Sequence, residues 1–387
     1  MNFVNSTNHQ DDYNFSDEEL YTLKPSQIKQ YFCLIAYGTE DPNLDTDFPT
    51  ICRSSNLEFA KKAISSFMPN RNMPWNQQSS QGNPTRSSEL NDLIKIVKKR
   101  EVRKQGKASC ARRAMEISEF RQLINENRFP RNDGYTHKYA LAAYFIFQFH
   151  MVARVDDVMH FKCDDLTPHL EFEFALKSKM CWSKNLLDER STTDQIILGA
   201  GDKDFCTLLA LAIHLEINIG NGTVGGNGED PNATLMGIGK NLAQTRLKAI
   251  VENEDFDRAA EGPLGSHSTR KGAATFARRN GCSKDDIDAR GRWKGQKRMV
   301  DTYIDGCLPY PDARVASSLC IGGPVKYELK RDSRISEDWL VEHVSSNIAR
   351  VFPRRVAIVL GKALLWATQQ RKKLLNDFLK SFFAFLK

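Results

Sequence analysis

The chain has 387 residues, of which 41% are hydrophobic and 27% are charged, and this globular composition excludes a collagen, a long coiled coil and a wholly disordered chain. Its formal charge is +7 and its nine cysteines form no CxxC pair, so we expect free thiols in a reducing compartment and no metal site. No apolar stretch reaches the ~18 residues that suggest a membrane span, and we therefore expect no membrane partner.

The N-terminal region combines a polar start with three helical patterns. Residues 1–20 are polar and acidic, so we expect them to be disordered. The patterns that follow predict a helical domain over residues 21–98, in which Gly38 ends the first helix and Ser54 or Ser55 caps the second. The three helices are expected at residues 23–38, 54–69 and 86–102.

A strongly basic segment follows the third helix. Nine lysines and arginines lie within residues 95–113, with Glu101 as the one acid. We interpret the segment as a helix end that runs into a basic linker at residues 99–114. It could be a solvated helix face, a nuclear import signal that would place the protein in the nucleus, or a strap across nucleic-acid phosphates. In the last role the DNA-binding residues are Lys98, Lys99, Arg100, Arg103, Lys104, Lys107, Arg112 and Arg113.

Residues 115–335 are expected to form a second domain that is mostly α-helical and contains a small antiparallel β-sheet. Residues 139–153 are apolar nearly all round, which predicts a central buried helix. Residues 170–179 alternate between apolar and polar side chains, which predicts a half-buried strand with Lys177 and Lys179 on its polar face. The apolar run TDQIILG is the expected partner strand across a long hairpin.

Arg154 directly follows the predicted buried helix. A charged side chain that leaves a core helix must find an anion or a carboxylate, because burying it alone is costly. Asp157, three residues further on, is the simplest partner. A structural ion pair and an anion-binding role both remain open for this arginine.

A second stretch, GSHSTRKGAATFARRNG, predicts a helix that Ser266 or Ser268 caps. His267 and Arg270 are three residues apart and therefore project from one face of its first turn. An imidazole and a guanidinium at a helix N-terminus suit a phosphate, although a surface turn could carry both by chance.

A third stretch, ARGRWKGQKRMVDTYIDG, contains Trp293 and Tyr303. Trp293 lies 23 residues after Arg270, and Tyr303 lies ten residues after Trp293. Taken singly, Trp293 fits core packing and Tyr303 fits a half-buried helix. Taken singly, the two hairpin lysines fit a solvated edge strand that lysine protects from pairing.

Together these stretches resemble the tyrosine recombinase family in their order and in the spacing from Arg270 to Trp293. The segments KKREVRKQGKASCARRA, NPTRSSELNDLIK and SHSTRKGAATFARR look like Crypton-type transposon recombinases of eukaryotes, and the resemblance covers residues 56–368. It implies a helical core-binding domain followed by a mixed α/β catalytic domain, with double-stranded DNA held between them.

The resemblance also implies a role for each residue of the set. Arg154 and Arg270 would clamp the non-bridging oxygens of the scissile phosphate, with His267 sharing the clamp and assisting proton transfer. Tyr303 would attack phosphorus and form a 3′-phosphotyrosine link, and Trp293 would pack behind it.

Two further roles come from the same resemblance. Lys179 would protonate the departing 5′ oxygen, although Lys177 lies on the same strand face and is an alternative. Asp157 would orient the first arginine. Tyr310 is an alternative nucleophile, but Pro309 and Pro311 flank it and favour a turn there.

The implied function is a site-specific DNA recombinase or integrase, encoded by or derived from a Crypton-like mobile element. Because the phosphotyrosine ester stores the energy of the broken bond, the reaction would need no metal, ATP or other cofactor. The alternative is a transposon-derived DNA-binding protein that has lost catalysis. A helical scaffold without a DNA role would leave the basic segment unexplained.

The C-terminal helices, within residues 336–387, bear on assembly. Residues 354–369 are apolar around more of their circumference than a lone surface helix needs. The catalytic domain's own core, a neighbouring protomer or a membrane could cover them. We favour the neighbour, since related recombinases dock a C-terminal helix onto the next subunit of a tetramer on DNA.

Overall fold

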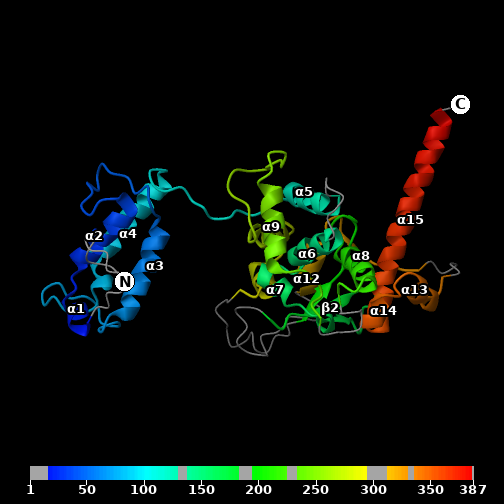
Figure 1. The fold of residues 1–387 in the computed structure, drawn as a ribbon, viewed down its shortest axis with the longest axis horizontal. Helices are drawn as coiled ribbons and strands as arrows, with labels where there is room; N and C mark the ends of the chain where they lie inside the picture. The colour runs from blue at the N-terminus through cyan, green and yellow to red at the C-terminus, as the bar shows by residue number, and fades with distance from the viewer. Residues whose placement is uncertain are drawn as a thin grey trace. The chain divides into compact units, whose positions relative to one another are not determined.

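The computed structural model describes residues 16–129, 137–182, 194–224, 233–293, 312–329 and 335–385, with side chains as far as residue 369 in the last range. The chain divides into two compact units, residues 1–110 and residues 111–387 (Figure 1). The division falls inside the segment that we interpret as a basic linker.

In the described residues 16–110, unit 1 has four α-helices, α1 Asp17–Thr22, α2 Pro25–Tyr37, α3 Ser54–Phe67 and α4 Ser88–Val102, and a short 3₁₀ helix at Pro84–Arg86. As predicted, α2 ends at Gly38, whose φ of 86° suits glycine. Helix α1 begins inside the segment expected to be disordered, because Ser16 and Glu19 form a reciprocal capping box. The hydrophobic core of unit 1 contains Phe32, Leu57, Leu90 and Val97.

The predicted cap of α3 is wrong. The capping residue is Arg53, and Ser54 is already the first helical residue. Glu101 of α4 performs the capping function instead, since its carboxylate accepts the Ser54 backbone N–H at 2.6 Å and the Arg53 guanidinium at 2.7 Å. A carboxylate at a helix N-terminus replaces a serine cap because it meets the same unpaired N–H group with a full charge.

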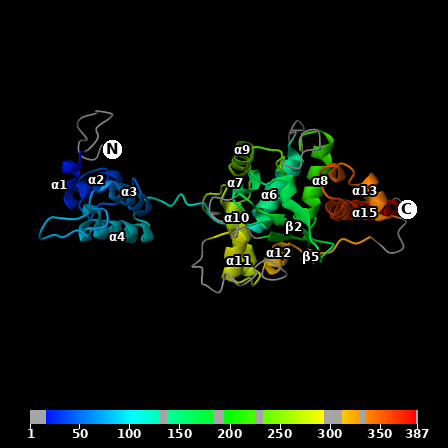
Figure 2. The ribbon, with the colours of Figure 1, turned by 90° about the horizontal axis from the view of Figure 1, so that it is seen from below.

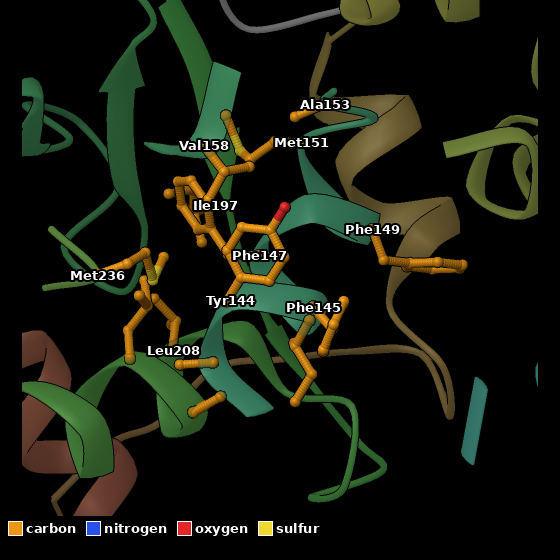
Figure 3. Packing of buried hydrophobic residues seen from close by; sticks show 14 of the residues in the cluster. Tyr144, Phe145, Phe147, Phe149, Met151, Ala153, Val158, Ile197, Leu208 and Met236 are labelled. Atoms are coloured by element: carbon orange, nitrogen blue, oxygen red, sulfur yellow. The ribbon is translucent and has the colours of Figure 1, made fainter. Parts of the chain in front are cut away.

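Unit 2 is built around α6 (Lys138–His150), which confirms the predicted central helix. Its side chains Tyr144, Phe145, Phe147 and Phe149 are almost completely buried (Figure 3). Helices α5 (Ile117–Arg128), α8 (Thr207–Gly220) and α10 (Ser268–Arg279) pack against it. The remaining described helices are α7 Val155–Met159, α9 Lys240–Val251, α11 Lys284–Gly291, α12 Asp312–Leu319, α13 Glu337–His343, α14 Ile348–Val351 and α15 Arg354–Phe385 (Figure 2).

A three-stranded antiparallel sheet has the order β1-β2-β3, with β1 Leu166–Pro168, β2 Leu176–Lys179 and β3 Asp194–Ile197. Strand β3 pairs with β2 as predicted, so the fold is mostly α with a small antiparallel sheet. A second, two-stranded sheet joins β4 Gly199–Ala200 to β5 Pro324–Val325.

The predicted strand over residues 170–179 is too long. Only its last four residues are extended, and Leu170 is 77% exposed. The His169 ring accepts the backbone N–H groups of Glu171 and Phe172 at 3.2 and 3.0 Å. A side chain that binds its own backbone in this way diverts the chain into a turn despite an alternating pattern.

The start of α15 belongs to the core of its own unit. Val356, Ala357, Leu360 and Ala363 are fully buried, and α15 packs against α8 and α13. This burial corrects our interpretation that a neighbouring protomer covers residues 354–369. The later turns of α15 project beyond α13 and α14 (Figure 1). Within the described ranges, no helix combines the length and hydropathy needed to cross a bilayer.

Candidate phosphate-binding site

Asp157 is the centre of a buried cluster of charges in unit 2. It lies in α7, is fully buried, and its Oδ2 accepts the backbone N–H of Arg154 at 2.9 Å. The same oxygen pairs with Nη2 of Arg292 at 3.3 Å and with Nη1 of Arg270 at 3.8 Å. The predicted Arg154–Asp157 contact is thus made through the backbone, while two other arginines share the carboxylate charge.

Arg270, the third residue of α10, presents hydrogen-bond donors that nothing in the described part of the chain accepts. Its side chain is 5% exposed and donates from Nη2 to the carbonyl of Gly291. Its Nε and Nη1 atoms are buried without a hydrogen-bond acceptor among the described residues. Because unmet buried donors are costly, this guanidinium is suited to an anionic ligand.

The electrostatics around Arg270 point the same way. Burial, followed by the charges of Arg154 and Arg292, lowers the pKa of Arg270 to about 9, whereas Asp157 opposes the shift. The group is therefore still charged at neutral pH. Three guanidiniums against one carboxylate leave an excess of positive charge that a phosphate would neutralise.

His267 lies at the N-terminus of α10, where it is the capping residue and is exposed. Ser266 and Ser268 do not cap this helix as predicted, because the Ser268 hydroxyl accepts the backbone N–H of Gly265 at 3.0 Å and so completes the preceding turn. Burial, then the charges of Arg270 and Arg154, lowers the pKa of His267 below 6.5. Both causes favour the neutral imidazole.

Trp293 joins the same cluster. Its ring is partly buried against the core and lies under the Arg270 guanidinium, whose Cζ is 4.4 Å from the ring centroid. A Cβ atom at Gly291 would clash with this ring, so glycine is required for the close approach. A guanidinium stacked on an indole keeps its orientation while its edge stays available for hydrogen bonds.

The two hairpin lysines have different surroundings. Lys177 forms an ion pair with Asp194, with Nζ 2.6 Å from Oδ2. Lys179 is exposed, and no contact between its side chain and the arginine cluster is observed. Ser178, between them, is buried on the opposite face of the strand. Lys179 is therefore the lysine that remains available for a ligand.

Arg292 is a member of the cluster that sequence reasoning missed. It follows α11 with φ 54° and ψ 38°, a left-handed conformation that a non-glycine residue adopts at a cost. Its Nη1 donates to Oε1 of Gln195 at 2.9 Å and to the carbonyl of Arg290 at 3.3 Å. Arg292 directly precedes Trp293, but no pattern in this stretch of sequence indicates that the arginine points inward.

A buried ion pair brackets the segment that carries the candidate nucleophiles. Nη1 of Arg290, at the end of α11, lies 2.7 Å from Oδ1 of Asp312, the first residue of α12. The intervening residues 294–311 include Tyr303 and Tyr310, and both tyrosines lie outside the described residues. The pair therefore holds the two ends of this segment together.

Several cations of the basic segment already bind other groups of the protein. Arg100 donates to the carbonyls of Leu44 and Asp45, and Arg113 forms a buried ion pair with Glu119. These two guanidiniums serve their own units, which removes them from the set expected to reach phosphates. Lys98 pairs with exposed Glu58. Among the eight residues expected to bind DNA, the exposed ones are Lys98, Lys99, Arg103, Lys104, Lys107 and Arg112.

Comparison with known proteins gives similarities only at the level of solved structures. No family model and no curated protein sequence matches the chain. An FLP recombinase–Holliday junction complex matches with a TM-score of 0.43 and 16% identity, over 64% of this chain and 63% of that chain. A Flpe–Holliday junction complex matches with a TM-score of 0.43 and 13% identity, over 89% and 92% of the two chains. At these scores we base the function on the chain's own side chains.

Proposed function

We propose that this protein is a DNA strand-exchange enzyme of the tyrosine recombinase type, derived from a Crypton-like mobile element and active in the nucleus. It would cleave and religate double-stranded DNA through a 3′-phosphotyrosine intermediate. The observation that carries the proposal is the buried cluster in which Arg270 and Arg292 pair with Asp157, next to Arg154, whose backbone N–H the same carboxylate accepts. Unmet donors on Arg270 give that cluster a place for a phosphate.

The arrangement suits a phosphodiester in particular. In the attack on phosphorus, negative charge builds on the two non-bridging oxygens, and preorganised cations stabilise that charge without reorganising. The guanidinium of Arg270 is held by Gly291, Asp157 and Trp293, so its free edge has a fixed direction. Arg154 is the N-cap residue of α7, and its backbone N–H donates to the carboxylate of Asp157, which also pairs with Arg270, so we expect its guanidinium to bind the same phosphate.

Side chains of this protein can supply the nucleophile, the proton acceptor and the proton donor that the reaction needs. The phenolic oxygen of Tyr303 forms a bond to phosphorus as the bond from phosphorus to the 5′ oxygen breaks. Neutral His267 accepts the phenol proton, and the Lys179 ammonium donates a proton to the departing 5′ oxygen. The reverse steps on another 5′ hydroxyl religate the strand.

Lys179 takes the role of general acid because Lys177 is committed elsewhere. An ammonium that is ion-paired to Asp194 must break that pair before it can donate to a DNA oxygen. Lys179 has no such competing pair in the described part of the chain. The exposed cations of the basic segment would contribute phosphate contacts that do not depend on sequence.

Covalent trapping tests the proposal. A duplex selected from a randomised pool by binding, then nicked beside the cleaved position, should trap wild-type protein covalently because the short cleaved strand diffuses away. Arg270→Ala should abolish trapping, whereas Arg279→Ala should not, since Arg279 lies exposed in the last turn of α10 and pairs with Glu116.

Two results would count against the proposal in different ways. Binding of the selected duplex without any covalent product would favour the alternative, a transposon-derived DNA-binding protein without catalysis. Equal trapping by Arg270→Ala and by wild-type protein would show that the arginine cluster does not bind the reacting phosphate.

A further inference from the structure

The hairpin formed by β2 and β3, here called the lysine hairpin, is fastened to the arginine cluster at two separate places. One fastening is a buried hydrogen-bond chain, and the other is an exposed aromatic stack. Neither involves Lys179 directly, yet both lie within a few residues of it.

The buried fastening runs through Gln195 of β3. Gln195 pairs in register with Ser178, which lies between the two lysines, and its side chain is 1% exposed. Its Oε1 accepts Nη1 of Arg292 at 2.9 Å, and its Nε2 donates to the carbonyl of Arg290 at 2.7 Å. Nη2 of Arg292 continues to Asp157 at 3.3 Å, so two consecutive contacts, from Gln195 to Arg292 and from Arg292 to Asp157, join the hairpin to the cluster.

The exposed fastening joins the end of β2 to the end of α7. The rings of Trp182 and His160 stack with centroids 3.7 Å apart and planes 15° from parallel. His160 directly follows α7, and its Nδ1 contacts the carbonyl of Asp156 at 2.7 Å, which fixes the imidazole ring. Trp182 is three residues beyond Lys179, a separation of at most ~10 Å along the chain.

We infer that Gln195, Arg292, Trp182 and His160 are positioning residues that hold Lys179 at a fixed distance from the phosphate clamp, so that its ammonium meets the departing 5′ oxygen. This inference rests on the proposed function. Proton transfer occurs only within hydrogen-bond reach, and a displacement of about 1 Å can cost ~100-fold in rate. Without the two fastenings, a four-residue strand carrying a flexible lysine offers no such precision.

The test uses the full-length protein and a substitution that the fold tolerates. Trp182 is 41% exposed, so Trp182→Ala should fold, whereas changes at buried Gln195 could unfold the protein. Trp339→Ala is the matched control, because Trp339 is 40% exposed and stacks on His343 with centroids 4.7 Å apart, in α13. Trp182→Phe retains a ring and should rescue the defect.

The decisive measurement compares two leaving groups. Single-turnover cleavage is followed on the selected duplex with either oxygen or sulfur at the 5′ bridging position of the scissile phosphate. A thiolate leaves without protonation, so a defect in the general acid disappears with sulfur. We expect Trp182→Ala to slow cleavage of the oxygen substrate at least ~10-fold, in line with lost positioning, with unchanged DNA affinity and near-wild-type cleavage of the sulfur substrate.

Hydrogen exchange supplies a readout that does not need activity. Trp182→Ala should speed amide exchange in Leu176–Lys179, whereas Trp339→Ala should not. Wild-type rates for Trp182→Ala on the oxygen substrate, an equal defect with sulfur, or unchanged exchange in β2 would each overturn the inference. If the wild-type protein cleaves neither substrate but Trp182→Ala still speeds exchange in β2, the proposed function would be overturned, whereas the structural role of Trp182 would stand.

Discussion

The Arg290–Asp312 pair permits a sharp prediction about stability. Arg290 is 1% exposed and Asp312 is 7% exposed in their side chains. Arg290 also donates to the carbonyls of His150 and Ile196 at 2.9 and 3.0 Å, while Oδ2 of Asp312 accepts the Ile196 N–H at 2.6 Å. Asp312→Asn keeps the size of the side chain but removes its charge, which leaves a buried guanidinium without a counter-ion.

Breaking a buried pair on one side costs about 3–5 kcal/mol, because the remaining charge stays desolvated. For a unit of this size, that loss corresponds to a fall in Tm of roughly 6–20 °C. Urea unfolding of the full chain measures it directly. Arg314→Ala is the control, since Arg314 lies two residues further along α12 and its side chain is 66% exposed, with a long 3.8 Å pair to Asp286. This substitution should cost less than ~1 kcal/mol.

If Asp312→Asn lowers the free energy of unfolding by less than about 1 kcal/mol, the reasoning is refuted, because a buried guanidinium without a counter-ion should destabilise the fold by more than that. Equal losses in Asp312→Asn and Arg314→Ala would show that burial of the pair has no energetic consequence. Either result would also remove the argument that the pair holds the ends of the segment with Tyr303.

Three further predictions concern DNA binding, assembly and pH. Replacing the exposed cations Lys99, Arg103 and Lys104 with alanine should make the slope of log affinity against log salt shallower by ~0.9 per lost phosphate contact. An unchanged slope would show that the basic segment does not bind DNA phosphates. Deleting residues 370–387 should leave a folded protein that binds one DNA half-site but does not form tetramers on DNA, as size-exclusion chromatography would show. Deleting residues 350–387 should instead unfold unit 2, because it removes the buried start of α15. Burial lowers the pKa of His150 to about 3 and of His214 to about 4. The unfolded state therefore binds more protons than the folded state below pH 6.5, and the free energy of unfolding should fall by about 3–4 kcal/mol between pH 7 and pH 5. Constant urea midpoints over that range would contradict this prediction.

The features that the sequence predicted well depend on local pattern. Helix α6 has apolar side chains all round and became the centre of unit 2, and Gly38 ended α2 where a left-handed residue was needed. Arg154, His267, Arg270 and Trp293 lie close together, but only the His267–Arg270 pair followed from helix spacing; the rest of the grouping came from the resemblance to tyrosine recombinases.

The features that the sequence did not predict depend on contacts between distant residues. Glu101 caps α3 from another helix, so no serine at the helix start could reveal it. The inward direction of Arg292 comes from a left-handed backbone and from Gln195, 97 residues away. The choice between Lys177 and Lys179 follows from Asp194 on the partner strand. The register of β2 and β3 places Asp194 opposite Lys179, but its carboxylate pairs diagonally with Lys177, which only the side-chain geometry shows.

The central claim is that Tyr303 attacks a DNA phosphate held by the arginine cluster. The most direct measurement is mass spectrometry of peptides from the covalently trapped complex. We predict a nucleotide attached to the peptide that contains Tyr303, and its complete loss in Tyr303→Phe with DNA binding intact. An adduct that persists in Tyr303→Phe and maps to Tyr310, or bound DNA without any adduct in wild-type protein, would contradict the claim.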